Sequence, residues 1–169
     1  MPGARYFITC SAVRPESRLI HPTCANAILD LIRNMDTADF SLACATIMSD
    51  HIHLLFSLSG ELSLSRVVAK FKSLTRNALI ALEIQWQANF FEHRLRPDEL
   101  SNDYARYIFL NPYRAGFLNR SEEWPYWILG LDADFDFLSF LEESKYPPSE
   151  WLNAPLLALG LDDSSIGHD

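Results

Sequence analysis

The stretch from residue 49 to residue 56 constrains the fold most, because its alternation is typical of a β-strand. It reads Ser-Asp-His-Ile-His-Leu-Leu-Phe. Successive side chains of a strand point to opposite faces, so we expect His51 and His53 on one face and Ile52 on the other. Two imidazoles side by side on a rigid strand form half of a divalent-metal site. Two polar residues on the solvent-exposed face of a strand would give the same pattern, so the motif alone leaves both interpretations open.

The composition predicts one globular domain without a membrane segment. The chain has 169 residues, and 49% of them are hydrophobic, which is enough for a buried core. It contains no run of the roughly 18 apolar residues that a membrane span needs, and its N-terminus lacks the apolar stretch of a signal peptide. The three cysteines are widely spaced and form neither a zinc pattern nor a disulfide framework, so we expect a cytoplasmic protein.

The net charge of −8 is distributed unevenly along the chain. Residues 1–120 contain 13 Lys and Arg residues against 11 acidic residues, whereas residues 121–169 contain one Lys against 11 acidic residues. The overall negative charge therefore does not exclude a nucleic-acid partner for the first part. We expect a catalytic domain over residues 1–127 and an acidic extension over residues 128–169. The extension either covers a cationic groove and competes with DNA or serves only as a solubilising segment.

The order of the predicted elements indicates the fold class. Apolar periodicity and β-branched or aromatic runs predict a strand over 5–13, a helix over 22–35, strands over 40–48 and 51–58, a helix over 62–83, a strand near 90–95 and a helix over 98–111. Pro112 is expected to end the last helix. Only Ser49 and Asp50 connect the second and third strands, so these strands must be antiparallel. The βαββαβ order predicts an α+β, ferredoxin-like antiparallel sheet with helices on one face, followed by a C-terminal helix that carries a tyrosine.

The predicted helix over 62–83 carries four cations that a DNA backbone could contact. Arg66 and Lys70 are four residues apart and share one face, and Lys72 and Arg76 lie close by. Long cationic side chains on one helical face suit phosphate groups. A solvated helix surface has the same composition, and the sequence does not choose between the two interpretations.

The last predicted helix carries a second chemically active group. Tyr107 and Asn111 are four residues apart and therefore share a face of this helix. Presented to a strand with two histidines, they would place a phenol beside a metal ion and add an amide oxygen as a third ligand for Mg²⁺ or Mn²⁺. The alternative is that Tyr107 packs in the core and that Asn111 only marks the helix end.

Three segments together resemble the single-tyrosine HUH transposases, and most closely their subgroup of REP-associated tyrosine transposases. Residues 48–55 are similar to the histidine strand of that family. Residues 107–117 are similar to its tyrosine helix, including the Asn-Pro-x-Arg-Ala-Gly motif, and residues 86–96 are similar to a further segment of the subgroup. The usual Pro-Asn turn is replaced by Ser49-Asp50. We interpret Asp50 as a turn residue, although its carboxylate could also orient a histidine.

The resemblance implies an enzyme that cuts and rejoins single-stranded or hairpin DNA. In this interpretation His51, His53 and Asn111 bind Mg²⁺ or Mn²⁺, and Tyr107 is the nucleophile. Attack would give a 5′-phosphotyrosine, and the retained bond energy would allow rejoining without ATP. The candidate DNA-contacting residues are Arg66, Lys70, Lys72, Arg76 and Arg114.

Two other functions fit the same residues. A domesticated DNA-binding protein would keep the fold and bind specific sequences without turnover. A metal hydrolase would use the two histidines with an activated water, although no general base is evident. Tyr104 and Tyr113 are neighbouring tyrosines, and Tyr107 is preferred over Tyr104 because an amide follows it by four residues. We expect no membrane partner, and either a monomer or a homodimer.

Overall fold

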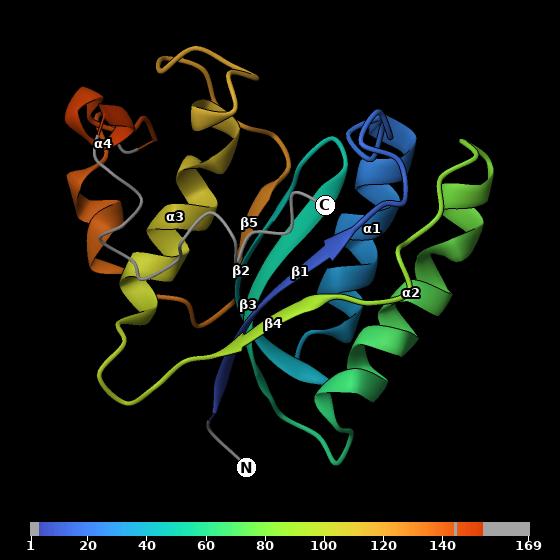
Figure 1. The fold of residues 1–169 in the computed structure, drawn as a ribbon. Coiled ribbons are helices and arrows are strands. Elements are labelled where there is room, and N and C mark those ends of the chain that lie inside the picture. Colours follow the sequence, from blue (N-terminus) through green and yellow to red (C-terminus); the bar gives the residue numbers. More distant parts are fainter. Residues whose placement is uncertain (1–3, 144, 154–169) are drawn as a thin grey trace.

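A five-stranded antiparallel sheet between two layers of helices forms the described part of the chain (Figure 1). The computed structural model describes residues 4–143 and 145–153. Its strands are β1 (Arg5–Ser11), β2 (Phe40–Ile47), β3 (His51–Leu58), β4 (Phe91–Arg94) and β5 (Trp127–Leu129). Its helices are α1 (Pro22–Met35), α2 (Leu64–Ile80), α3 (Ser101–Arg114), the 3-10 helix η1 (Asp136–Phe140) and the short α4 (Ser149–Asn153). The strands lie in the order β4-β1-β3-β2-β5, so β3 is central.

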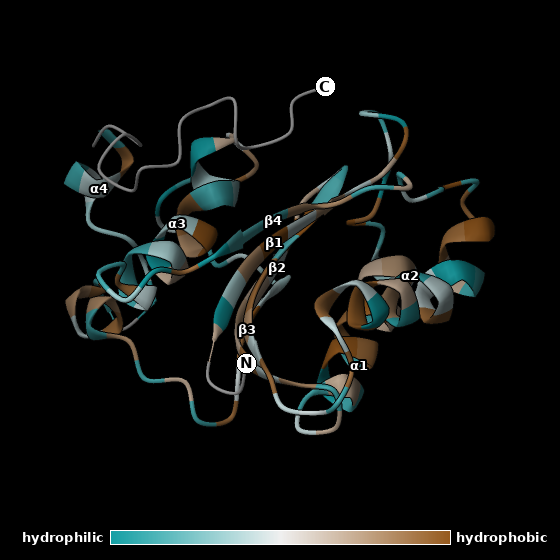
Figure 2. Cartoon of the chain, turned by 60° about the horizontal axis from the view of Figure 1, so that its bottom comes forward, coloured by the Kyte–Doolittle hydropathy of each residue, from teal (hydrophilic) through white to brown (hydrophobic). Residues whose placement is uncertain are grey.

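The two faces of the sheet are covered by different helices. Figures 1 and 2 show α1 and α2 on one side of the sheet and α3 and α4 on the other. Ile52, Leu54 and Phe56 of β3 belong to the core under α1 and α2. Leu55 belongs to the second core, under α3, and the histidines of β3 share its face. The alternation predicted for this strand is therefore confirmed.

The α+β class and the predicted order of the elements are confirmed, but the helices expected over 62–83 and 98–111 begin two and three residues later, at Leu64 and Ser101, and also end at other residues. The helix expected to end at residue 83 ends at Ile80, because Glu83 adopts a positive φ of 57° that an α-helix does not accommodate. The expectation that Pro112 ends the last helix is wrong, because α3 continues to Arg114. A proline in the last turn removes one backbone hydrogen bond, while the Ala115 N–H still bonds the Asn111 carbonyl.

The residues after the predicted domain boundary continue the same fold. β5 pairs with β2, so the boundary at residue 127 falls inside a strand of the sheet. Both η1 and α4 pack against α3. The remainder of the predicted acidic extension, residues 154–169, lies outside the described residues. None of the described helices combines the length and the apolar character that a membrane span requires.

Candidate active site

The two histidines of β3 face each other at the α3 side of the sheet. Their Nε2 atoms are 3.1 Å apart, and their ring centroids are 4.6 Å apart. His53 is completely buried. Because strand geometry sends residues 51 and 53 to the same face, the backbone itself sets this juxtaposition. The two imidazoles that the sequence places on one face of the strand therefore lie next to each other in the structure.

The other ring nitrogen of each histidine has an oxygen partner. Asp50 Oδ1 lies 2.7 Å from Nδ1 of His51, and Thr9 Oγ1 lies 2.8 Å from Nδ1 of His53. If each Nδ1 carries the proton, each Nε2 keeps a lone pair for an ion, which is how outer partners orient histidine ligands. Asp50 is thus more than a turn residue, contrary to our interpretation of the sequence. Its position directly before His51 was a usable signal, whereas nothing in the sequence pointed to Thr9.

Asn111 of α3 completes a three-residue cluster with the histidines. Its side-chain amide nitrogen Nδ2 lies 3.1 Å from Nε2 of His53, across 58 residues of sequence. The nitrogen and oxygen of an amide are told apart only by their hydrogen bonds, so the oxygen can take this position when the partner is a cation. The structure therefore brings together all three predicted metal ligands.

The donor set fits a divalent ion. Imidazole nitrogens and an amide oxygen are donors that Mg²⁺ and Mn²⁺ can accept, and the two Nε2 atoms, 3.1 Å apart, are close enough to bind one ion. Within residues 4–143 and 145–153, no group of three or more His, Cys, Asp or Glu side chains could hold a metal ion. An ion at the two histidines would therefore depend on the Asn111 oxygen and would keep positions open for water or phosphate oxygens.

Tyr107 lies beside this cluster. Its ring centroid is 5.7 Å from that of His53 and 6.0 Å from that of Phe7. Only 5% of the residue is exposed, so most of the ring is part of the core under α3. A substrate can touch only this small exposed part unless α3 or its neighbours shift.

The two other tyrosines of α3 have other partners. The Tyr104 hydroxyl donates a hydrogen bond to Glu99, and the Tyr113 hydroxyl donates one to the backbone carbonyl of Glu122. Burial is the largest cause that raises the pKa of Tyr104, followed by its bond to Glu99. Burial also raises the pKa of Tyr113, to about 12. Neither phenol is therefore suited to ionise, whereas Tyr107 contacts a predicted metal ligand.

Arg114 lies on the same face of α3 as Tyr107 and Asn111, at positions i+7 and i+3. Burial lowers the pKa of Arg114, and its interaction with Tyr107 opposes this shift. Its Nη2 donates a 2.8 Å hydrogen bond to the carbonyl of Trp151 in α4. The extension of α3 past Pro112 places Arg114 on the face of the helix that carries Tyr107 and Asn111.

The predicted cations of α2 lie on the opposite face of the sheet from the histidines. Lys70 forms an ion pair with Asp39 at 2.7 Å. Lys72 donates hydrogen bonds to three backbone carbonyls of residues 87–89, and burial lowers the pKa of Lys72. Arg66 and Arg76 are exposed. The structure thus ties two of the four cations to contacts within the chain and brings none of them to the histidines.

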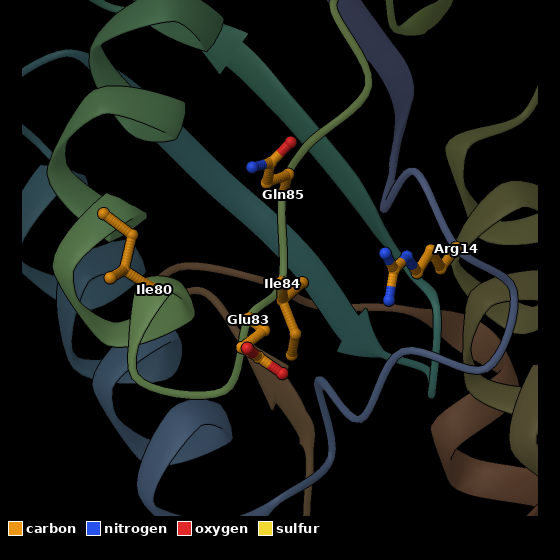
Figure 3. A pocket seen from close by; sticks show the side chains of 5 residues that line it. All are labelled: Arg14, Ile80, Glu83, Ile84 and Gln85. Carbon is orange, nitrogen blue, oxygen red and sulfur yellow. The ribbon is translucent and has the colours of Figure 1, made fainter.

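Two hollows are lined by residues of α2 and of the loop that follows it, and Tyr107 lines neither. One, of about 330 Å³, is lined by Arg14 together with residues 80 and 83–85 at the end of α2 (Figure 3). The other, of about 570 Å³, extends along α2 to Lys72 and Arg76 and includes Trp86. Neither contains a predicted metal ligand.

Comparisons with known proteins identify the family of the chain and agree with the fold. The family model described as "Transposase IS200 like" matches residues 7–109, which include both histidines and Tyr107. The chain is 23% identical over 128 residues to the REP-associated tyrosine transposase of Escherichia coli (strain K12), with 73% of this chain and 75% of that protein covered. It is 27% identical over 101 residues to a Haemophilus influenzae protein assigned to the same group, with 52% and 57% covered.

A solved structure has a similar fold. It is that of a REP-associated tyrosine transposase bound to a REP hairpin, with a TM-score of 0.58, 24% sequence identity, and 75% of this chain and 77% of that chain covered. The predicted resemblance is therefore confirmed at the level of the family. With more than half of its residues matched by the family model, the chain belongs to the IS200-like transposases.

Proposed function

We propose that this chain is a metal-dependent endonuclease and strand transferase for single-stranded DNA, with Tyr107 as its nucleophile. The observation that carries the proposal is the convergence of Tyr107, Asn111 and His53 from two separate elements, α3 and β3. Membership of a transposase family supports the reaction class. The hairpin in the related solved structure supports hairpin DNA as the substrate.

The nucleophilic step follows from the chemistry of the phenol. The Tyr107 oxygen would form a bond to phosphorus, the bond from phosphorus to the 3′ oxygen would break, and the 5′ phosphate would stay on the tyrosine. The phenol proton would leave to solvent, and the departing 3′ oxygen would take up a proton. A different 3′ hydroxyl could then reverse the step and join two strands.

The three polar residues around Tyr107 would prepare the phosphate for attack. His51, His53 and Asn111 would hold Mg²⁺ or Mn²⁺. When bound, the ion would neutralise charge on a non-bridging phosphate oxygen as the transition state forms. Asp50 and Thr9 would keep the imidazoles in the orientation that the structure has.

Arg114, on the same face of α3, would act on the nucleophile through its charge. A phenol has an unperturbed pKa of about 10 and is a weak nucleophile at neutral pH. A neighbouring cation favours the ionised form. An electrostatic interaction between Arg114 and Tyr107 would therefore favour the ionised form of the nucleophile.

The test is cleavage of a labelled hairpin oligonucleotide with a single-stranded flank, in Mg²⁺ or Mn²⁺. We expect a covalent protein–DNA adduct that survives denaturation. Tyr107→Phe should remove it, and Tyr104→Phe, the matched control on the same helix, should retain it.

Each other outcome would indicate a different function for this chain. Tight hairpin binding without cleavage in either metal would indicate a domesticated DNA-binding protein. Cleavage that never gives an adduct would indicate a hydrolase with an activated water. An adduct that still forms in Tyr107→Phe would show that another residue is the nucleophile.

A further inference from the structure

Thr46 of β2 is directly paired with His53 and lies on the same face of the sheet. His53 therefore has a threonine on each side, because Thr9 of β1 pairs with it from the other neighbouring strand. The hydroxyl of Thr9 is hydrogen-bonded to the imidazole at 2.8 Å. The hydroxyl of Thr46 has no hydrogen-bond partner among the described residues, although Thr46 is 0% exposed.

An unpartnered buried hydroxyl is unfavourable, which makes the choice of threonine here informative. Leaving a buried polar group unsatisfied destabilises the fold, whereas an apolar side chain of the same shape would avoid that cost. Valine has this shape and favours strands as threonine does. We therefore expect the Thr46 hydroxyl to gain a hydrogen-bond partner in another state of the site.

The Asn111 amide is the group whose hydrogen bonds must change when an ion binds. Its Nδ2 lies 3.1 Å from Nε2 of His53, and this Nε2 is the nitrogen that would bind the ion. An ion that took this nitrogen and the amide oxygen would leave the two N–H groups of Asn111 without their acceptor. Thr46 lies beside His53 on the face that α3 covers, and its oxygen is available as an acceptor.

We propose that Thr46 is a positioning residue whose hydroxyl accepts a hydrogen bond from the Asn111 amide in the metal-loaded site. It would hold the amide with its oxygen toward the ion. The inference rests on the proposed metal site, and it assigns different roles to the two threonines that flank His53. The hydroxyl of Thr9 is hydrogen-bonded to His53 whether or not an ion is bound. The hydroxyl of Thr46 would form its hydrogen bond to Asn111 only when an ion is bound.

The test compares Thr46→Val with Thr9→Val in the full chain. Melting is measured in EDTA, and Mn²⁺ binding is measured by titration calorimetry. Without metal, Thr46→Val should raise the melting temperature by about 2–4 °C, since it removes an unsatisfied group, and Thr9→Val should lower it. Both variants should weaken Mn²⁺ binding by about tenfold or more, as changes in the outer partners of metal ligands do.

The opposite signs in EDTA distinguish this role from a purely structural one. Thr46→Ser, which retains the hydroxyl, should keep Mn²⁺ affinity within about twofold of the wild type. Equal affinity of the wild type and Thr46→Val would overturn the role of Thr46 and leave the metal site standing. Absence of Mn²⁺ binding to the wild type would overturn the proposed metal site together with this inference.

Discussion

The two faces of the sheet differ in what they bury. The face under α1 and α2 holds mainly apolar side chains, including Ile52 and Phe56 from β3. The face under α3 buries His53 together with Thr9 and Thr46, its direct neighbours on β1 and β2. Apolar burial stabilises a fold without regard to direction, whereas buried polar groups need specific partners.

The polar row under α3 is enclosed by aromatic residues. Phe91 of β4 pairs with Thr9, and Trp127 of β5 pairs with Thr46, so aromatic residues occupy both ends of the row. Figure 2 shows the sheet between the two helical layers, so the sheet itself separates the two environments. The even-numbered residues of β3 pack in the core under α1 and α2, and the proposed function assigns the chemistry to His51 and His53 on the other face. The predictions below test whether these two contributions can be separated.

The largest expected effect is on the α3 face. Tyr107→Phe should reduce adduct formation to background, because the nucleophilic oxygen is lost. The melting temperature should change by no more than a few degrees, because the ring that packs against His53 and Phe7 remains. Gel analysis of the adduct and a melting curve of the same sample measure the two quantities. A large loss of stability would mean that chemistry and packing are not separate on this face.

The opposite result, a loss of stability without a loss of cleavage, is expected at Ile52, which lies between the two histidines. Ile52→Ala should lower the free energy of unfolding by about 2–5 kcal/mol, because Ile52 is completely buried under α1 and α2. The cleavage rate per folded molecule should stay close to that of the wild type. Denaturant unfolding and single-turnover cleavage test this, and a rate that fell with stability would show that the two faces are coupled through β3.

A smaller effect is expected at the start of α3. Burial raises the pKa of Glu99, but hydrogen bonds from the Arg96 amide, His93 and Tyr104 outweigh it, so that the net pKa is lowered. A carboxylate with a lowered pKa in the folded state stabilises the fold above its unfolded pKa, and this stabilisation is lost as the pH falls. Glu99→Gln should therefore cost about 1–2 kcal/mol at pH 7 and progressively less in acid. A difference that stayed constant from pH 7 to pH 3 would contradict the role of the charge.

The smallest effect concerns DNA contacts on the face opposite the histidines. Arg76→Gln should weaken hairpin binding by about three- to fivefold and reduce the salt dependence of binding by roughly one unit. Arg33→Gln on α1, whose side chain pairs with Asp30, is the control for the loss of one positive charge. Equal hairpin affinities of the wild type and Arg76→Gln over a salt series would contradict a role of this face of α2 in DNA binding.

The sequence made the elements and the main site predictable because both follow local spacing. Alternation placed His51 and His53 on one face, and a spacing of four residues placed Tyr107 and Asn111 on another. Both are properties of a single element. The contact between the two pairs could be anticipated only through the resemblance to a family, because it depends on how α3 packs on the sheet.

The remaining features depend on pairing between distant segments. Thr9 and Thr46 enter the site through strand register, which no local pattern encodes. Lys70 and Lys72 look like free cations in the sequence, but Asp39 and the carbonyls of the loop after α2 bind them. The bond from Arg114 to α4 depends on the chain folding back after β5.

The most direct test of the central claim is to locate the covalent attachment by mass spectrometry after incubation with hairpin DNA and Mn²⁺ or Mg²⁺. Digestion with trypsin should release a peptide from Tyr107 to Arg114 that contains two tyrosines, so fragmentation must assign the nucleotide. We predict a 5′-phosphate on Tyr107. Attachment to Tyr113, or to Tyr104 in the preceding peptide, would contradict it.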